Sequence, residues 1–178
     1  MSRKLVICEK PSVARDVAGA LPESFTQKGD AYESEHWVIS YAVGHLLEQV
    51  DPDEYDPRFR KWTYEDLPII PQEFRYQPRD GRAAKQLASL HRLMSRKDVT
   101  GIVNACDAGR EGELIFRLIE QYAAGAKGTL NKPVKRLWLQ SMTPQAIREG
   151  FDKLRSDEQM RGLADAARSR SEADWLVG

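Results

Sequence analysis

The stretch "NACDAGREGELI", residues 104–115, joins an apolar run to a helical pattern through a turn rich in charged residues. The apolar run, Ile102–Cys106, predicts a buried strand, and the glycines that follow permit a tight turn. An acid at the end of a strand and two more acids on the first turn of a helix suit a magnesium ion and a phosphate. They suit a solvated helix start that binds nothing as well, and the residues alone leave both interpretations open.

The same plan of a strand followed by a helix recurs on either side of this stretch. Strands are predicted over Leu5–Cys8 and Val134–Leu139, and each precedes apolar residues with helical spacing. Thr143 and Pro144 form a typical helix start. Alternating strands and helices predict an α/β fold, a parallel sheet flanked by helices. The three helical faces comprise Val13, Ala14, Val17, Ala18 and Leu21; Leu114, Ile115, Leu118, Ile119 and Tyr122; and Ala146, Ile147, Gly150, Phe151 and Leu154.

An insertion of different character separates the first helix from the second strand. His36–Val43 predicts a strand, hairpin-paired with Ala31–Glu33. Asp51–Gly81 contains five of the nine prolines and little periodicity, which predicts a long irregular segment. A helix follows, marked by apolar residues at 83, 87, 90 and 94. Residues 160–178 form a further helical pattern that ends apolar, so we expect a helix cut short from a longer chain.

Composition sets limits on the class of protein. The chain has 178 residues, 41% of them hydrophobic and 30% charged, as in a soluble globular domain. No apolar run is long enough for a membrane span or a secretory signal, so we expect a cytoplasmic protein. The formal net charge is zero, so any case for nucleic-acid binding must be local, at the basic clusters 58–62 and 167–171. We expect Cys8 and Cys106 to be small buried side chains at strand ends rather than redox groups.

Three acids are predicted to meet at one edge of the sheet. Ligands of open parallel sheets lie beyond the carboxyl ends of the strands, where Glu9 and Asp107 follow two of the predicted strands. Glu111 lies on the next helical turn, whereas Glu113 is about 200° further round the helix and should face away. Oxygen ligands beside a phosphate favour Mg²⁺, and the alternative remains an acidic helix start.

Five motifs together resemble a known family. They are "EKPSVA" at 9–14, "VGHLLEQ" at 43–49, "RKWTYEDLPIIP" at 60–71, "DAGREGELIFR" at 107–117 and "ADWLVG" at 173–178. In this order they resemble the N-terminal part of type IA DNA topoisomerases, bacterial topoisomerase III above all. The resemblance implies a Toprim domain, a Rossmann-like parallel sheet shared with bacterial primases. We expect this domain over residues 1–156, and the truncated start of a following helical domain over 157–178.

The resemblance also implies an activity and assigns roles to residues. In type IA topoisomerases a tyrosine attacks one DNA strand, forms a 5′-phosphotyrosine and leaves a 3′-hydroxyl. Glu9 then matches the general acid or metal ligand, and Lys10 matches the lysine at the scissile phosphate. His45, Trp62, Arg110 and Arg170 fall at DNA-contacting positions. Their alternatives are a capping histidine, a tryptophan that anchors the proline-rich segment, and solvated arginines.

The family's nucleophilic tyrosine lies in a later domain, and the six tyrosines of this chain match no part of its motif. We therefore expect the chain alone neither to cleave nor to relax DNA. Single-stranded DNA and the remaining domains of the same enzyme are the expected partners, with no membrane and a monomeric state. A Toprim primase or nuclease and a non-catalytic DNA-binding module remain alternatives.

The acidic motif departs from the family pattern D-x-D-x-E at its middle position. Asp107 and Glu111 match the outer acids, but Gly109 stands where the second aspartate would be. A carboxylate lost from a set of closely spaced charges weakens cation binding. We expect Mg²⁺ to bind weakly through Glu9, Asp107 and Glu111.

Overall fold

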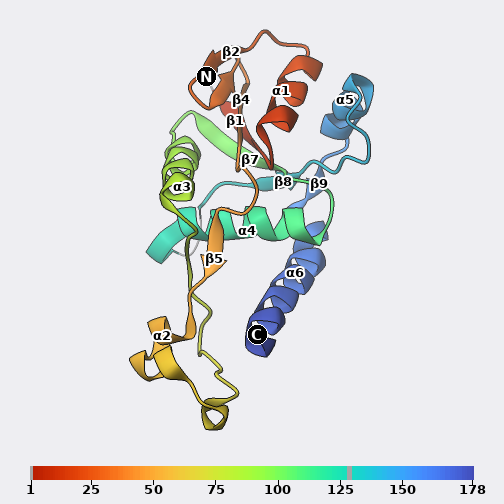
Figure 1. Cartoon of the computed structure of the whole chain (residues 1–178). Coiled ribbons are helices and arrows are strands. Elements are labelled where there is room, and N and C mark those ends of the chain that lie inside the picture. Colours follow the sequence, from red (N-terminus) through yellow and green to blue (C-terminus); the bar gives the residue numbers. More distant parts are fainter. Residues whose placement is uncertain (1, 128–129) are drawn as a thin grey trace.

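A computed structural model describes residues 2–127 and 130–178, and its centre is a seven-stranded sheet in the order β2-β3-β4-β1-β7-β8-β9 (Figure 1). The four neighbouring strands β4, β1, β7 and β8 are parallel, which confirms the predicted parallel sheet. The outer strands pair antiparallel with their neighbours: β3 with β4, β2 with β3, and β9 with β8. The bounds of the parallel strands are β1 (Arg3–Cys8), β4 (Trp37–Tyr41), β7 (Val99–Ala105) and β8 (Val134–Arg136).

The parallel strands form because their side chains are buried on both faces of the sheet. Leu5, Val6 and Ile7 of β1 are fully buried, and Val6 pairs with Ile39 of β4 and Val103 of β7. A strand covered on both faces has no polar side to alternate with, so its sequence is a continuous apolar run. This pattern made β1 and β7 predictable from the sequence.

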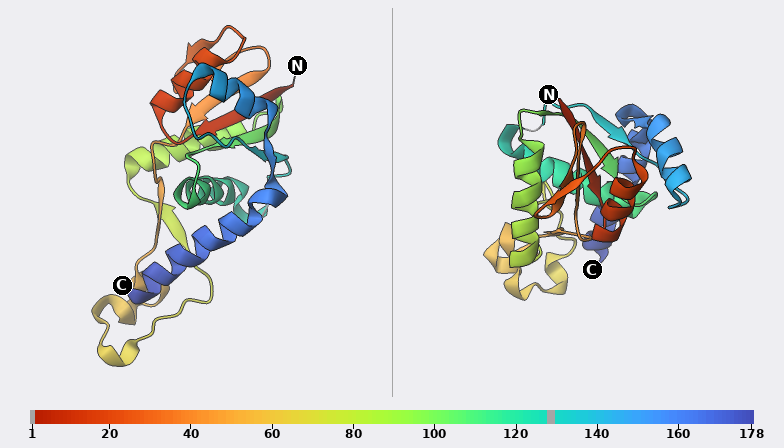
Figure 2. Two further views of the ribbon diagram at one scale, coloured as in Figure 1. Left: turned by 90° about the vertical axis from the view of Figure 1, so that its right-hand side faces the viewer. Right: turned by 90° about the horizontal axis from the view of Figure 1, so that it is seen from above.

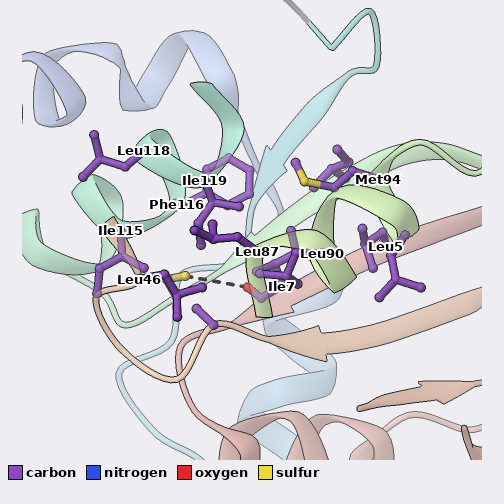
Figure 3. Packing of buried hydrophobic residues seen from close by; sticks show 14 of the residues in the cluster. Leu5, Ile7, Leu46, Leu87, Leu90, Met94, Ile115, Phe116, Leu118 and Ile119 are labelled. Carbon is purple, nitrogen blue, oxygen red and sulfur yellow. Dashed lines mark hydrogen bonds between the residues drawn. The ribbon is translucent and has the colours of Figure 1, made fainter. Parts of the chain in front are cut away.

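Helices cover the two faces of the sheet. On one face, α1 (Pro11–Ala20) and α5 (Pro144–Asp152) contribute Val17 and Ile147 to a buried cluster. On the other face, α3 (Gly81–Met94) and α4 (Arg110–Ala124) pack on the same strands. Figure 3 shows Leu87 and Leu90 of α3, Ile115, Phe116 and Ile119 of α4, and Leu5 and Ile7 of β1 in this second cluster.

Two details of the predicted pattern are wrong. The strand predicted over Val134–Leu139 ends at Arg136, because its pairing with β7 stops there, opposite Asn104. Tyr122, predicted on the buried face of α4, is 43% exposed. It lies in the last turn of α4.

The insertion is more ordered than predicted. The hairpin is confirmed, since β3 (Ala31–Glu33) pairs antiparallel with β4, and β2 (Thr26–Lys28) extends it. Within the segment predicted to be irregular, β6 (Tyr76–Pro78) pairs with β5 (Leu47–Gln49). Residues 51–75, here termed the arm, project from the body (Figures 1 and 2). The arm contains α2 (Pro52–Tyr55), η1 (Pro57–Lys61) and η2 (Tyr64–Asp66), each too short to show periodicity.

The last helix, α6 (Asp157–Val177), connects the body to the arm (Figure 2). α6 directly follows β9 (Arg155–Ser156) in the chain. The short helix η3 (Gly125–Lys127) directly follows α4. At the start of α6, Asp157 pairs with Arg117 of α4 at 2.7 Å. Near its end Trp175 donates a hydrogen bond to the carbonyl of Val50 and packs edge-on against two rings of the arm, Tyr55 and Phe74.

None of the helices within the described residues combines the length and apolar character that crossing a bilayer requires.

Candidate functional site

Glu9, Lys10 and Asp107 lie together at the carboxyl edge of the sheet. Glu9 directly follows β1, and Asp107 comes two residues after β7. The two strands are parallel neighbours whose last paired residues are Cys8 and Ala105, so both acids emerge at the same edge. The ammonium of Lys10 lies 3.7 Å from the Glu9 carboxylate and 3.5 Å from the Asp107 carboxylate. One exposed lysine therefore faces two acids.

Burial and the neighbouring Asp107 change the protonation of Glu9. This residue is 7% exposed, and burial together with a hydrogen bond to Asp107 and the negative charge of Asp107 raises the pKa of Glu9 to about 7. The charge of Lys10 opposes this shift without cancelling it. The same contacts raise the pKa of Lys10, chiefly through the charge of Asp107. Glu9 can therefore hold a proton, and release it, close to neutral pH.

Glu111, the third predicted metal ligand, lies on the first turn of α4. Its side chain is 78% exposed, and one of its oxygens is 3.1 Å from Nε2 of His45. Within residues 2–127 and 130–178, no three His, Cys, Asp or Glu side chains are arranged to hold a metal ion. Glu9 and Asp107 meet at Lys10, whereas Glu111 contacts His45, so in the described residues the three predicted ligands do not form one metal-binding cluster.

Glu113 faces away from Glu111, as the helical spacing predicted. It is fully buried, pairs with Arg117 at 2.9 Å and with Arg136 at 3.2 Å, and accepts a hydrogen bond from Asn104. Its charge is therefore satisfied inside the protein.

Arg136 at the end of β8 holds the turn that carries Asp107, and sequence reasoning missed it. Its buried guanidinium donates hydrogen bonds to the backbone carbonyls of Asn104, Cys106 and Asp107, the last at 2.8 Å. The signal was a lone arginine in the apolar stretch "VKRLWL", since an arginine in such a setting needs several acceptors. Cys106 is buried, as is Cys8, which confirms both as buried strand-end residues.

Two glycines shape the turn from Asp107 into α4. Gly109 has a φ of +149°, a backbone conformation that other residues rarely adopt. At Gly112 a Cβ atom would lie 2.0 Å from the backbone oxygen of Asp107, so the helix start packs directly on the turn. These requirements explain the glycines of "DAGREGE" and keep the amide end of α4 close to Asp107.

An open cavity of about 750 Å³ lies between the start of α4 and the second half of α6. Asp107 and Glu111 line it, and so do three of the predicted DNA-contacting residues, His45, Arg110 and Arg170. The fourth, Trp62, is elsewhere, on the arm and 54% exposed. Gln49, Asp174 and Trp175, which belong to the quoted motifs but had no predicted role, also line the cavity.

A parallel sheet with an acid after its first strand and an acidic, glycine-containing turn into a helix defines the class of this chain. It belongs to the Toprim domain family, whose sequence model matches residues 4–142.

Within that family, the chain is similar to proteins named DNA topoisomerase 3. It is 44% identical over its whole length to that of Bacillus subtilis and 42% identical to one from Bacillus cereus. It is 43% identical over 99% of its length to that of Staphylococcus haemolyticus. In each case the chain spans 24% of the relative's length.

Proposed function

We propose that this chain supplies the acid and phosphate-binding side of a type IA topoisomerase active site that acts on single-stranded DNA. The observation that carries the proposal is the contact of Glu9, Lys10 and Asp107 at one sheet edge. The similarity to proteins named DNA topoisomerase 3 supports it. In this proposal the nucleophilic tyrosine belongs to a longer enzyme, in a region corresponding to the part of the relatives that lies outside their match to this chain.

The chemistry assigned to each residue follows from its surroundings. Glu9, with a pKa near 7, is the proton donor to the 3′ oxygen that leaves when the DNA strand breaks. Lys10 is exposed beside it and balances the negative charge that develops on the phosphate. After cleavage Glu9 is left as a carboxylate, and it takes the proton back when the 3′-hydroxyl attacks during rejoining.

The donor atoms at this edge fit Mg²⁺ in kind. All three candidate ligands, Glu9, Asp107 and Glu111, offer carboxylate oxygens, which Mg²⁺ prefers. Lys10 already faces two of them, so in the free protein its ammonium supplies part of the positive charge. When bound, Mg²⁺ would supply charge neutralisation at the phosphate.

DNA contacts are proposed at two places. His45, Arg110 and Arg170 line the cavity beside Asp107, where their side chains can bind phosphates. Trp62 offers an exposed ring on which a base can stack.

The proposal includes a division of the chain into a Toprim domain, residues 1–156, and the start of a following helical domain, residues 157–178. It also includes a monomeric state, the remaining domains of the same enzyme as partners, and action in the cytoplasm.

A chimera tests the proposal. Residues 1–178 replace the matching region of the Bacillus subtilis relative, and relaxation of negatively supercoiled plasmid is measured. We expect the chimera to relax DNA and its Glu9→Gln variant to be at least about a hundredfold slower, the usual contribution of a general acid. Glu149→Gln, an exposed acid on α5, is the control and should relax normally. Relaxation at parental rate by the Glu9→Gln chimera would exclude the role of Glu9.

The isolated chain provides the complementary measurement. We expect it to leave supercoiled plasmid unchanged, with Mg²⁺ or without, because it lacks the tyrosine. Nicking by the isolated chain that depends on Glu9 would favour a nuclease-type Toprim domain instead.

The metal assignment has its own test. Mg²⁺ is titrated into the isotope-labelled chain, and the backbone amides of Glu9, Asp107 and Glu111 are followed by NMR. We expect weak binding with shifts confined to this edge, and none of these shifts in Asp107→Asn. An Asp107→Asn variant that binds Mg²⁺ as well as the parent would contradict the assignment.

A further inference from the structure

Helix α3 and the residues just after it concentrate positive charge. Residues 81–97 contain five Lys or Arg residues and no Asp or Glu, in a chain with 27 residues of each sign. A segment of this length with no acid stands out against such a balanced composition. The candidate site described above uses none of these basic residues.

The helix presents its basic residues to solvent on one side. Leu87, Leu90 and Met94 point into the core beneath α3 (Figure 3). Arg82, Lys85 and Arg92 are exposed, and their spacing of three and seven residues puts them on one face, opposite the buried leucines. From Arg82 to Arg92 this face extends about 15 Å along the helix axis. We name these three residues the α3 basic face.

No ion pair within the described residues neutralises the α3 basic face, although the charge of Arg82 acts on Asp80. Among the described residues, no carboxylate lies within ion-pair distance of Arg82, Lys85 or Arg92, whereas Arg96 one turn later pairs with Asp98 and Glu33. The nearest acid in sequence, Asp80, is engaged as the helix N-cap, where it accepts a hydrogen bond from the amide of Ala83. Arg92 donates a hydrogen bond to the hydroxyl of Ser89 at 3.4 Å.

The helix begins at the same sheet edge as the candidate site. Gln86, in the second turn of α3, donates a hydrogen bond to the carbonyl of Tyr41, the last residue of β4. Because β4 and β1 are parallel neighbours, this places the start of α3 at the carboxyl edge, where Glu9 also lies. From there the helix runs along the sheet away from that edge (Figure 1).

We propose that the α3 basic face binds the phosphate backbone of single-stranded DNA, beyond the stretch held at the candidate site. The proposal rests on the proposed function, since it extends the path of the same substrate. Three unpaired cations on a rigid helix complement a regularly spaced polyanion, and phosphate contacts of this kind do not depend on base sequence. The contact therefore increases the affinity for single-stranded DNA and sets the path of the strand along α3.

The test measures binding of a fluorescent oligothymidylate by the 178-residue chain over a range of salt concentrations. The variant Arg82→Glu, Lys85→Glu, Arg92→Glu reverses the α3 basic face. Its matched control, Arg15→Glu, Lys135→Glu, Lys153→Glu, makes the same charge change at exposed basic residues outside α3. Circular dichroism and thermal unfolding establish that both triple variants remain folded.

Three phosphate contacts on a single strand contribute about 2 to the slope of log affinity against log salt. We expect the α3 variant to lose about 2 from this slope and to bind more than about tenfold more weakly at 0.1 M salt, while the control keeps the parental slope. Equal slopes in the two triple variants, or no DNA binding by the parent at low salt, would overturn the proposal. So would an α3 variant that loses binding to poly-glutamate while its DNA binding is unchanged, because this would assign the face to acidic proteins.

Failure of this inference is distinguishable from failure of the proposed function. Glu9→Gln should bind the oligonucleotide with the parental salt slope, since Glu9 contributes no positive charge. If the chimera relaxes plasmid in a Glu9-dependent manner but the α3 variant binds like its control, only the α3 proposal is wrong.

Discussion

The two ends of the central strands carry clusters of the same residue types in opposite electrostatic states. At the amino end, Arg3 and Arg96 face Glu33 and Asp98, with ion pairs of 2.6 to 3.2 Å. The hydrogen bonds and charge of Arg96 lower the pKa of Asp98 to about 2, and Arg96 lowers that of Glu33 as well. Every carboxylate in this cluster has a guanidinium.

At the carboxyl end, two acids share one lysine at 3.5 and 3.7 Å, and the pKa of Glu9 rises to about 7. Glu9 is buried beside a second acid, whereas each acid at the amino end has a guanidinium, so burial and the ratio of acids to bases together decide whether a charged cluster holds the fold together or is ready to exchange a proton. Groups with strongly shifted pKa values toward neutrality are typical of functional sites.

The largest effect is expected from removing the buried cation that supports the carboxyl end. Arg136→Met removes one of the two arginines that pair with the buried Glu113, together with the donor to the backbone carbonyls of the Asp107 turn, which should cost about 3 to 5 kcal/mol of unfolding free energy. Urea denaturation measures this loss. Adding Glu113→Gln should restore part of it, because the buried charge that has lost one of its two arginines is then removed. If the unfolding free energy of Arg136→Met alone were within about 1 kcal/mol of the parent's, Arg136 would not be needed to hold the turn.

An intermediate effect is expected at the amino end. The pKa of Asp98 is lowered from 3.8 to about 2 on folding, so its ion pair stabilises the fold fully above pH 3.8 and less as the pH falls toward 2. Since its side chain is one-third exposed, Asp98→Asn should cost about 1 to 2 kcal/mol near neutral pH and almost nothing at pH 2. Unfolding followed between pH 2 and 7 tests this, and a cost that does not shrink in acid would contradict the pairing.

The smallest effect should have the opposite sign. The pKa of Glu9 is raised from 4.5 to about 7, so the folded state loses stability as the pH rises through this interval. Glu9→Gln removes the cost of burying a charge as well as the repulsion by Asp107, and should stabilise the metal-free chain by about 1 kcal/mol at pH 8, with no gain at pH 4. Thermal unfolding in a chelator measures it. If Glu9→Gln were destabilising at pH 8, the two ends of the sheet would not differ in the way described.

The parts of the fold that sequence patterns predicted are those with a repeating burial pattern. The runs that form β1 and β7, and the faces of α1, α3 and α4, are buried along most of their length, so the apolar spacing identifies them. The pairing of β5 with β6 could not be predicted, because three-residue strands have no measurable period and their partner is distant in sequence. Likewise, β8 ends where its pairing with β7 ends, which is a property of the sheet rather than of residues 134–139.

The candidate site was partly predictable for a similar reason. Parallel strands end at one edge, so Glu9 and Asp107 could be placed together from their positions alone. Arg136 acts through backbone carbonyls of another strand, and no spacing in its own segment encodes those partners. That one lysine faces two acids at this edge depends on distances between side chains, which the order of residues does not contain.

The conformation of Gly109 determines which residues the turn before α4 can accept at this position. With φ at +149°, the turn has adopted a shape that an aspartate would occupy only under strain, although a Cβ there would meet no other atom within 4 Å. An aspartate at this position, as in the D-x-D-x-E pattern, is therefore opposed by the backbone and not by crowding. A carboxylate introduced here by one substitution would carry the strain of the turn, and a second substitution that reshapes the turn would be needed to relieve it.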